Sequence, residues 1–399
     1  MRRTKMLTRC RTRERSGTTP REDLRPFAGP PQSHWLHKGY APRVIRGKEQ
    51  RLGRWFMMVG LVIALFLIVS PEVAMASTSI ASAIRTAMVI ALSALALPAT
   101  AAEEWPQRAV RFICPLGPGS GADLGARLFA DRLSARWGQA VVVENHPGGD
   151  AVPAVMAFVN AHDNHTLFFA PAASFTAHPY MHDKMPYDRR DIVPIARVSN
   201  TILVIAVPTA LKVNSMEDLV ALAKASPGKL NWAGITGVHE FLFAGFGKSA
   251  GLSWTKVPYK DPVQAVNDLA EGRVDVYGTA YAIIRAQVLA GKVKILAVTN
   301  ASRAPMLPDL PTVIEAGFPE LRYDGLVGLF GPRNMTDDLR SRIAEDIRAV
   351  ADASIAEKLA VTGQVMSPGA AGEFGASIEE QRAMIARVAA DLGIKAATE

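Results

Sequence analysis

Apolar segments alternate with loops rich in glycine, proline and hydroxyl residues along most of the chain. The first such segment, Trp105 to Cys114, is short enough for a buried strand, and a glycine-rich loop at 115–123 follows it. Leucines then recur on one face between residues 124 and 137, and Gly138 ends the run. This pattern predicts a strand, a loop and a helix, with Gly138 just past the helix end.

The loop at 115–123 is the first candidate for chemistry. A glycine-rich loop before a helix leaves backbone N–H groups at the helix N-terminus, where the helix dipole favours an anion. The alternative is a tight turn whose glycines only meet the required backbone angles. Asp123 is expected to cap the helix.

The same arrangement of strand, loop and helix recurs further along the chain. Helix start signals occur at Ser215, Pro262 and Thr336, and a last long helix is expected over residues 373–392. Short apolar runs predict further strands at 140–143, 166–170, 202–207, 230–233, 254–257, 274–277, 294–298 and 327–330. Strands that alternate with helices imply parallel sheets, whose ligands lie beyond the carboxyl ends of the strands. The loops at 115–123, 146–149 and 171–176 are therefore expected to converge.

Two nucleotide motifs bear on the first loop. A phosphate-binding P-loop is excluded, because this loop ends in Gly-Ala-Asp and not in Gly-Lys-Ser/Thr. A dinucleotide fingerprint is matched weakly by Gly117, Gly119 and Ala122, and Glu144 stands near the place of a ribose-binding acid. The second match supplies a rival function, an NAD(P)-dependent oxidoreductase.

The basic charge of the chain belongs to its first quarter. Residues 1–102 carry 16 Lys and Arg against 5 Asp and Glu, whereas residues 103–399 carry 29 against 32, a net charge of −3. The folded part therefore gives no indication of nucleic-acid binding. We expect no disulfide, metal or other cofactor, and we interpret four histidines without metal spacing as surface residues: His162, His165, His178 and His182.

Residues 1–102 are expected to form a basic, disordered leader that ends in a secretory signal. Arg85, the apolar run 87–97 and the small residues up to Ala102 follow the order of a signal peptide and its cleavage site. The expected location is therefore the periplasm. An uncleaved membrane anchor, formed by this run, by the apolar run 55–70 or by both, is the alternative.

Motifs spread over residues 105–392 resemble those of the extracytoplasmic solute receptors of tripartite tricarboxylate transporters, the Bordetella uptake gene (Bug) family. Their order and spacing carry the resemblance, since no single motif is diagnostic. The motifs include Trp105-Pro106 with Arg111, Pro115 to Asp123, Val142 to Asn145, Met185 to Asp188, Pro227 to Asn231, Val257 to Lys260, and Leu307 to Thr312.

The resemblance implies a two-domain periplasmic-binding-protein (Venus-flytrap) fold. Each α/β domain would be a mainly parallel sheet flanked by helices, with a cleft between the domains. Residues 103–207 and 332–399 would form a discontinuous domain 1, and residues 208–331 would form domain 2. The chain would cross between them near Val207-Pro208 and Gly331-Pro332.

The resemblance also implies that loop amides and small hydroxyls hold a carboxylate, often through water. Hydroxyl and N–H groups bind an anion without burying a cation, so no arginine is required. Tyr259 either lines the cleft or packs, and His239 either faces the ligand or caps or packs against its helix. The candidate ligand-binding residues are Gly119, Ser120, Gly121, Ser174, Thr236, Gly237, His239, Tyr259 and Thr279.

Two positions depart from the family pattern. His146 stands where the family usually has an arginine before Pro-Gly, and Gly278-Thr279 stands where it usually has Asp-Asn. The second departure touches a position expected to face the ligand, so the resemblance does not by itself fix the ligand preference of this chain.

From the resemblance we expect a monomeric solute-binding receptor, and not an enzyme. It would capture a tricarboxylate, dicarboxylate, amino acid or aromatic acid and deliver it to the membrane subunits of a transporter. A ligand-sensing receptor that feeds a signalling partner is an alternative, beside the oxidoreductase.

The signal-like segment predicts that the mature protein begins at Ala102 or Glu103. N-terminal sequencing of protein recovered from the periplasm measures this start directly. A stable periplasmic chain that retains residues before Ala87 would contradict the prediction.

Overall fold

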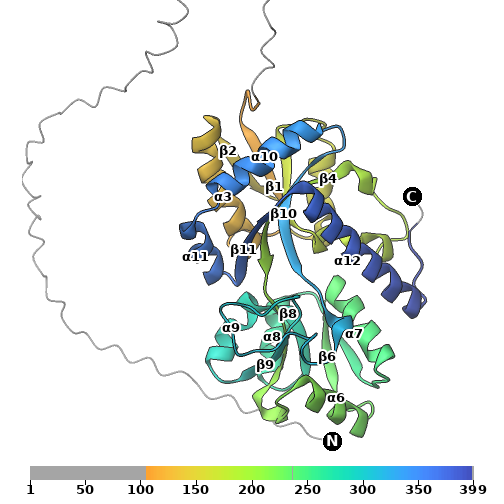
Figure 1. The fold of residues 1–399 in the computed structure, drawn as a ribbon. Helices are drawn as coiled ribbons and strands as arrows, with labels where there is room; N and C mark the ends of the chain where they lie inside the picture. Colours follow the sequence, from red (N-terminus) through yellow and green to blue (C-terminus); the bar gives the residue numbers. More distant parts are fainter. Residues whose placement is uncertain (1–104, 236, 398–399) are drawn as a thin grey trace, which may run out of the picture. The chain divides into compact units, whose positions relative to one another are not determined.

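We describe residues 105–235 and 237–397 in a computed structural model of the chain, shown as a ribbon in Figure 1. The strands of this part form two sheets. The first sheet contains, from edge to edge, β11 (Gln364–Gly369), β4 (Ile192–Thr201), β10 (Gly325–Pro332), β3 (Thr166–Pro171), β1 (Val110–Cys114) and β2 (Val141–Asn145). The second contains β7 (Thr255–Tyr259), β6 (Asn231–Ile235), β8 (Val276–Ala280), β5 (Leu203–Pro208) and β9 (Val293–Val298).

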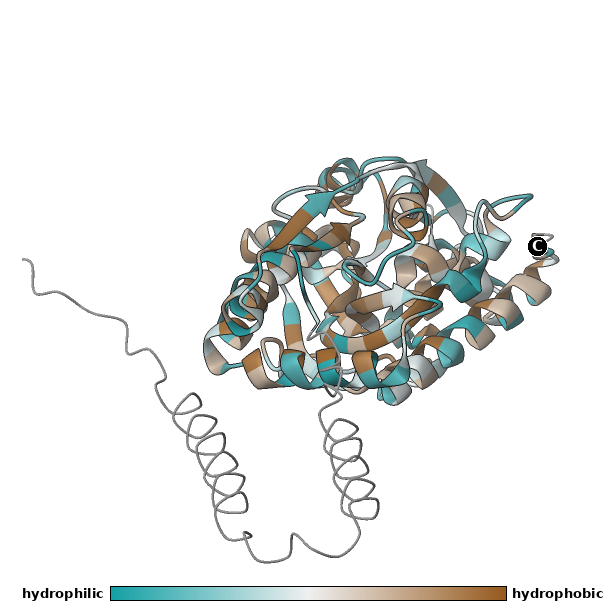
Figure 2. Cartoon of the chain, turned by 90° about the horizontal axis from the view of Figure 1, so that it is seen from above, coloured by the Kyte–Doolittle hydropathy of each residue, from teal (hydrophilic) through white to brown (hydrophobic). Residues whose placement is uncertain are grey.

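Helices accompany each sheet, and Figure 2 shows hydrophilic and hydrophobic segments alternating along them, as amphipathic helices require. With the first sheet lie α3 (Gly121–Trp137), α4 (Val152–Val159), α5 (Ala173–Thr176), α10 (Asp337–Val350), α11 (Ala353–Val361) and α12 (Ala371–Leu392). With the second sheet lie α6 (Met216–Ala225), α7 (Val238–Ser249), α8 (Pro262–Ala270) and α9 (Tyr281–Leu289).

The chain changes sheets twice, and we call the two parts lobe 1 (residues 105–201 and 325–397) and lobe 2 (residues 203–321, without 236). It leaves the first sheet after Thr201 and enters the second at Leu203, and it returns to the first sheet at Gly325. Both crossings precede the expected ones at 207–208 and 331–332. The expected positions lie at the ends of β5 and β10, whereas the sheet changes before each of these strands begins.

Both sheets are mixed, although the sequence pattern predicted mainly parallel ones. Strands β1, β2 and β3 pair in parallel, and so do β6, β7 and β8. The strands next to the crossings run antiparallel to their neighbours: β10 pairs in this way with β3 and β4, and β5 with β8 and β9. The two-lobe architecture with a sheet in each lobe agrees with the expected fold class.

Local signals located most helix ends correctly. Gly138 ends α3 in the left-handed conformation, with φ +65°, which confirms its predicted place. Ser215 and Thr336 cap α6 and α10 with their hydroxyl oxygens, and Pro262 opens α8. The last predicted helix is α12.

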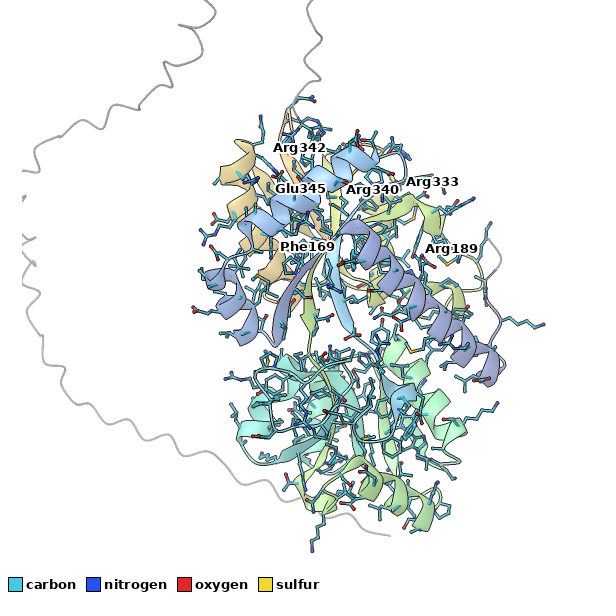
Figure 3. The ribbon with its side chains drawn as sticks, in the orientation of Figure 1. Phe169, Arg189, Arg333, Arg340, Arg342 and Glu345 are labelled. Carbon is cyan, nitrogen blue, oxygen red and sulfur yellow. The ribbon has the colours of Figure 1, made fainter. Side chains whose placement is uncertain are left out.

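Charged side chains lie on the outside of lobe 1, and Figure 3 labels several of them, together with the interior Phe169. Arg333 pairs with Asp188 and Asp191, and Arg340 pairs with Asp337. Ion pairs this exposed contribute about 1 kcal/mol or less each. The stability of lobe 1 therefore rests on its apolar core.

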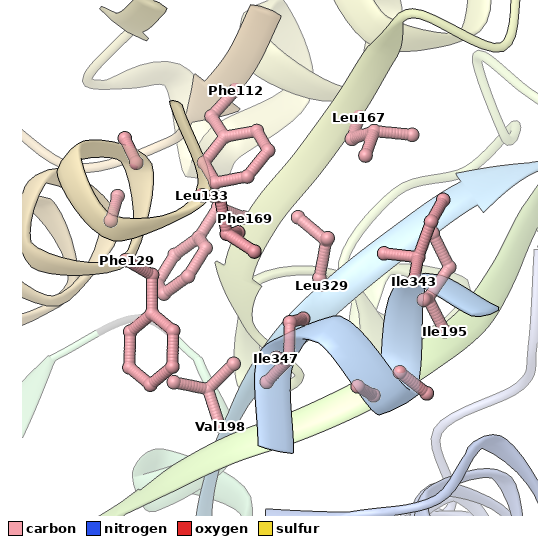
Figure 4. Packing of buried hydrophobic residues seen from close by; sticks show 14 of the residues in the cluster. Phe112, Phe129, Leu133, Leu167, Phe169, Ile195, Val198, Leu329, Ile343 and Ile347 are labelled. Atoms are coloured by element: carbon pink, nitrogen blue, oxygen red, sulfur yellow. The ribbon is translucent and has the colours of Figure 1, made fainter. Parts of the chain in front are cut away.

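That core fills the space between the first sheet and helices α3 and α10. Figure 4 shows Phe112, Phe129 and Phe169 meeting Leu329 and Ile347, all at most 1% exposed. A separate cluster, described below, joins the two lobes.

Two expectations about single residues are corrected here. His165 and His178 are buried, so their interpretation as surface residues is wrong. His178 exchanges hydrogen bonds with the Tyr187 hydroxyl at 2.5 Å and the Asp150 carbonyl at 2.7 Å. Such partners make a buried imidazole tolerable, which spacing along the sequence did not reveal.

The leader, both apolar runs and the cleavage site lie outside the described residues, so export through a signal peptide stays a prediction. Within residues 105–235 and 237–397, no helix combines the length and the apolar character needed to cross a lipid bilayer.

Gly328, in the middle of β10, tests how closely lobe 1 is packed. A β-carbon there would lie 2.4 Å from the ring of Phe374 and 2.5 Å from the carbonyl oxygen of Ala196. Gly328→Ala is therefore expected to lower the free energy of unfolding by about 3 kcal/mol, measured by urea denaturation. The control is Gly372→Ala in α12, where a β-carbon meets nothing within 4 Å. Equal unfolding midpoints for the two variants would contradict the packing argument.

Candidate functional site

The first candidate loop is built by a cap at the start of α3. Ser120 is the N-cap residue, and its Oγ accepts a hydrogen bond from the Asp123 N–H at 3.3 Å. Asp123 was expected to be the cap, but it lies three residues after the cap and its carboxylate accepts from the Gly119 N–H at 2.8 Å. The two side chains together satisfy donors on both sides of the helix start.

Asp123 is 1% exposed and is surrounded by donors. Its carboxylate also accepts from Asn145 Nδ2 at 2.8 Å and pairs with Arg127 at 2.9 Å. Burial alone would raise the pKa of Asp123, but hydrogen bonds from Arg127, Gly119 and Asn145 outweigh it and lower that pKa. The loop therefore rests on a buried, paired carboxylate.

Some backbone N–H groups of the loop have an acceptor within the protein, and others have none. The Gly119 N–H is used by Asp123, so Gly119 contributes chiefly through its φ of +82°, which favours glycine. The N–H groups of Gly121 and Ala122 are the first two of α3, and no acceptor for them is found in the described part of the chain. Their binding of an anion stays a prediction.

The second candidate loop opens α7 in lobe 2. Gly237 is its N-cap, with φ +131°, and no side chain caps the helix within the described residues. The first N–H groups of α7 are thus left for another acceptor, as at α3. Thr236, the residue before this cap, lies outside the described residues, and its proposed role stays a prediction.

A cluster of apolar side chains, the interlobe cluster, brings several candidate loops together. It contains Ala177 of lobe 1, Val238 at the start of α7 and Leu203 of β5, and Ala173 and Ala280 pack against it. The residues next to these along the chain are the candidates Ser174, Gly237, His239 and Thr279. The structure therefore gathers four candidates from both lobes around one cluster.

Three polar atoms at this junction make no hydrogen bond of good geometry in the described part of the chain: Thr176 Oγ1, Tyr323 Oη and His239 Nε2. Burial dominates and raises the pKa of Tyr323, although the Thr176 hydroxyl is close enough to favour the ionised form of Tyr323. Thr176 and Tyr323 are each 2% exposed, and the rings of His239 and Tyr323 are 6.2 Å apart. Burial lowers the pKa of His239 to about 4, so its ring is neutral at pH 7. Thr176 closes the expected 171–176 loop but was not a candidate residue, and no motif marks Tyr323.

Tyr259 lies apart from this junction. It packs among Ala265 and Leu269 of α8, and its hydroxyl donates to Asp268 Oδ2 at 2.6 Å. Burial and this hydrogen bond raise the pKa of Tyr259 to about 12. Of the two readings of Tyr259, the contacts support packing.

Glu144 of the dinucleotide match is also engaged. Its two carboxylate oxygens accept from Arg111 Nε and Nη2, each at 2.7 Å. A ribose would have to displace this bidentate pair, so the geometry does not favour the rival reading.

A cavity of about 800 Å³ lies between α12, β11 and the second crossing. Charged and apolar side chains both line it, and Arg322 within it donates to Glu380 at 2.7 Å and to Asp324 at 3.3 Å. None of the nine candidate residues lines this cavity.

Comparison with known families decides the class of protein. The model of the tripartite tricarboxylate transporter family receptor matches residues 125–392. The chain belongs to this family. The match begins just after the first candidate loop, covers both lobes and includes α7 and β8. The receptor is therefore a periplasmic solute-binding protein, as the motifs implied.

Individual relatives agree with this assignment. The receptor is 29% identical over 307 residues to a UPF0065 protein of Bordetella bronchiseptica, covering 76% of this chain and 91% of that protein. It is similar to a solved periplasmic transporter, with 28% identity, a TM-score of 0.63 and coverage of 73% and 99%. It is also similar to Rpa4515 of R. palustris, solved with adipate, with 27% identity, a TM-score of 0.61 and the same coverage.

The contacts of Asp123 predict a pH-dependent loss of stability in Asp123→Asn. At pH 7 the variant is expected to lose about 2 kcal/mol of unfolding free energy, because a neutral amide cannot replace the buried, paired carboxylate. The pKa of Asp123 is lowered in the folded state. Its stabilisation is therefore present above the unfolded-state pKa and is lost as the pH falls through the folded pKa.

The difference between Asp123→Asn and the wild type should accordingly shrink below about pH 4. Urea unfolding between pH 7 and pH 3 measures it, with the exposed Asp309→Asn as control. A difference that does not change over this range would show that the carboxylate charge has no part in holding the loop.

Proposed function

We propose that this receptor closes on a small carboxylate between its lobes and presents it to the membrane subunits of a transporter. The observation that carries the proposal is the pair of helix N-termini at α3 and α7, one in each lobe. Each has first-turn N–H groups without an acceptor in the described residues. Two such ends bind an anion through backbone dipoles and need no arginine.

The class of solute follows from the groups around the interlobe cluster. Ser174, Thr176 and Tyr323 are neutral hydroxyl groups, and His239 is neutral at pH 7. Neutral donors orient carboxylate oxygens, directly or through water, without a permanent charge. Rpa4515, which shares 27% of its residues with this receptor, was solved with adipate, and this supports a dicarboxylate as the first solute to test.

Binding would act by shifting a population. A solute that touches both helix ends contacts both lobes, and so stabilises the closed arrangement over the open one. A solute held by one lobe alone would bind without favouring closure. The transporter would then recognise the closed, loaded form.

We also propose that the receptor carries out no reaction. The one buried carboxylate of the first loop, Asp123, is committed to Gly119, Asn145 and Arg127, and so is poorly placed to act as a general base. Delivery of a solute to a transporter requires binding and release only.

A thermal screen tests the proposal. Adipate, succinate, citrate and malate are compared with NAD and NADP. A ligand at one hundred times its dissociation constant stabilises the native protein by about 2.7 kcal/mol, and we expect the melting temperature to rise by several degrees with at least one carboxylate. A shift with NAD and none with any carboxylate would overturn the receptor reading in favour of the oxidoreductase.

A pair of matched variants tests whether the thermal shift with a carboxylate depends on the α3 loop. Ser120→Ala removes the cap of α3, and Thr336→Ala removes the cap of α10, whose hydrogen bond has the same length of 3.3 Å. Each change is expected to lower stability by about 1 kcal/mol. Only Ser120→Ala should weaken the response to the carboxylate. If both variants respond equally to the carboxylate, the α3 loop has no part in binding it.

A further inference from the structure

Gln364 joins the first candidate loop to β4, the strand from which the chain leaves lobe 1. It is the first residue of β11 and is 1% exposed. Its Nε2 donates to the Gly121 carbonyl at 2.7 Å and to Thr362 Oγ1 at 3.0 Å, and its Oε1 accepts from the Ser199 hydroxyl at 2.7 Å. One side-chain amide thus bridges the start of α3 and the end of β4.

The close approach of Gln364 explains the glycine at position 121. A β-carbon on Gly121 would lie 2.9 Å from Gln364 Nε2, which is tighter than real contacts allow. A side chain at position 121 would therefore displace the amide packed against it.

The residue before Gln364 reaches the crossing and lobe 2. The Gly363 carbonyl accepts from the Ile202 N–H at 2.8 Å, and Ile202 is the residue between β4 and β5. A β-carbon on Gly363 would lie 3.1 Å from the backbone nitrogen of Ala282 in α9. On its other side, the Ile202 carbonyl accepts from the Tyr281 N–H at 2.9 Å.

We propose that Gln364 is a positioning residue for solute capture, which fixes the 117–121 loop relative to the crossing at Ile202. Adjacent residues in one turn hold the loop, the crossing and the start of α9, so a displacement of one is transmitted to the others. That the loop binds the solute rests on the function proposed above. The mechanical link between loop and crossing does not depend on it.

The chemistry of the amide makes this role specific to glutamine. Gln364→Met keeps a similar length and loses all three hydrogen bonds. Gln364→Asn keeps the amide, but its shorter side chain cannot span Ser199 and Gly121 together. Ser134→Ala is the matched control, because Ser134 lies near the far end of α3 and accepts one hydrogen bond, from the Val141 N–H at 2.8 Å.

Hydrogen exchange of the purified protein without added ligand tests the link. Segments that open together exchange together. In Gln364→Met and Gln364→Asn, we expect at least tenfold faster exchange at the hydrogen-bonded amides of 119–120 and 123–124, and also at 202–203 and 281. Ser134→Ala should change exchange near 138–142 only. Faster exchange confined to residues 362–366 in both glutamine variants would overturn the proposal.

Calorimetry with adipate as the probe tests the consequence for binding. We expect the dissociation constant for adipate to rise at least tenfold in the glutamine variants and to stay unchanged in Ser134→Ala. Unchanged affinity in both glutamine variants would overturn the positioning role. If adipate does not bind the wild type, the choice of solute fails, while the exchange experiment still decides the link between loop and crossing.

Discussion

Between Thr201 and Leu203 the chain leaves one sheet and enters the other, and the backbone groups at this step must be satisfied from elsewhere in the fold. The side-chain amide of Asn300, which is 3% exposed, does much of this: Nδ2 donates to the Thr201 carbonyl and Oδ1 accepts from the Leu203 N–H, both at 3.0 Å. The Ile202 peptide groups between them bond to Gly363 and Tyr281. The first crossing is therefore held by hydrogen bonds from both lobes, and Leu203 directly after it packs in the interlobe cluster.

In the proposed solute site, the nearby buried charge is likewise paired. The single buried carboxylate near the first loop is paired with Arg127, so it does not oppose an anion a few residues away. What remains for the solute is a set of backbone N–H groups and neutral side chains. Such groups keep their character over the physiological pH range, since burial moves the pKa of His239 to about 4 and that of Tyr323 upward.

Periodicity and capping rules predicted the elements whose signals are local. The helix that ends at Gly138 and the helices that start near Ser215 and Thr336 needed no long-range information. Interactions between distant residues were beyond such rules: Gln364 and Gly121 are 243 positions apart, and β4 carries a proline, an arginine and an asparagine that break its apolar pattern.

Asp123 was placed in the right turn but in the wrong role, because a carboxylate near a helix start can cap the helix or reach back to the loop before it. Ser174, Gly237, His239 and Thr279 lie beside the interlobe cluster, and their role in binding stays a prediction, whereas Tyr323 emerges only from the packing of the two lobes.

The position of β10 has a consequence for how the chain folds. This strand lies inside the first sheet, between β3 and β4, yet it is made only after all of lobe 2. The strands of lobe 2 are contiguous in the sequence, so that sheet can assemble as soon as β9 is available. Lobe 1 must wait for a central strand more than one hundred residues downstream of β4, and its early strands expose unpaired edges until then. A chain that emerges N-terminus first therefore completes its inserted lobe before the lobe that encloses it, and is most in need of protection from aggregation during that interval.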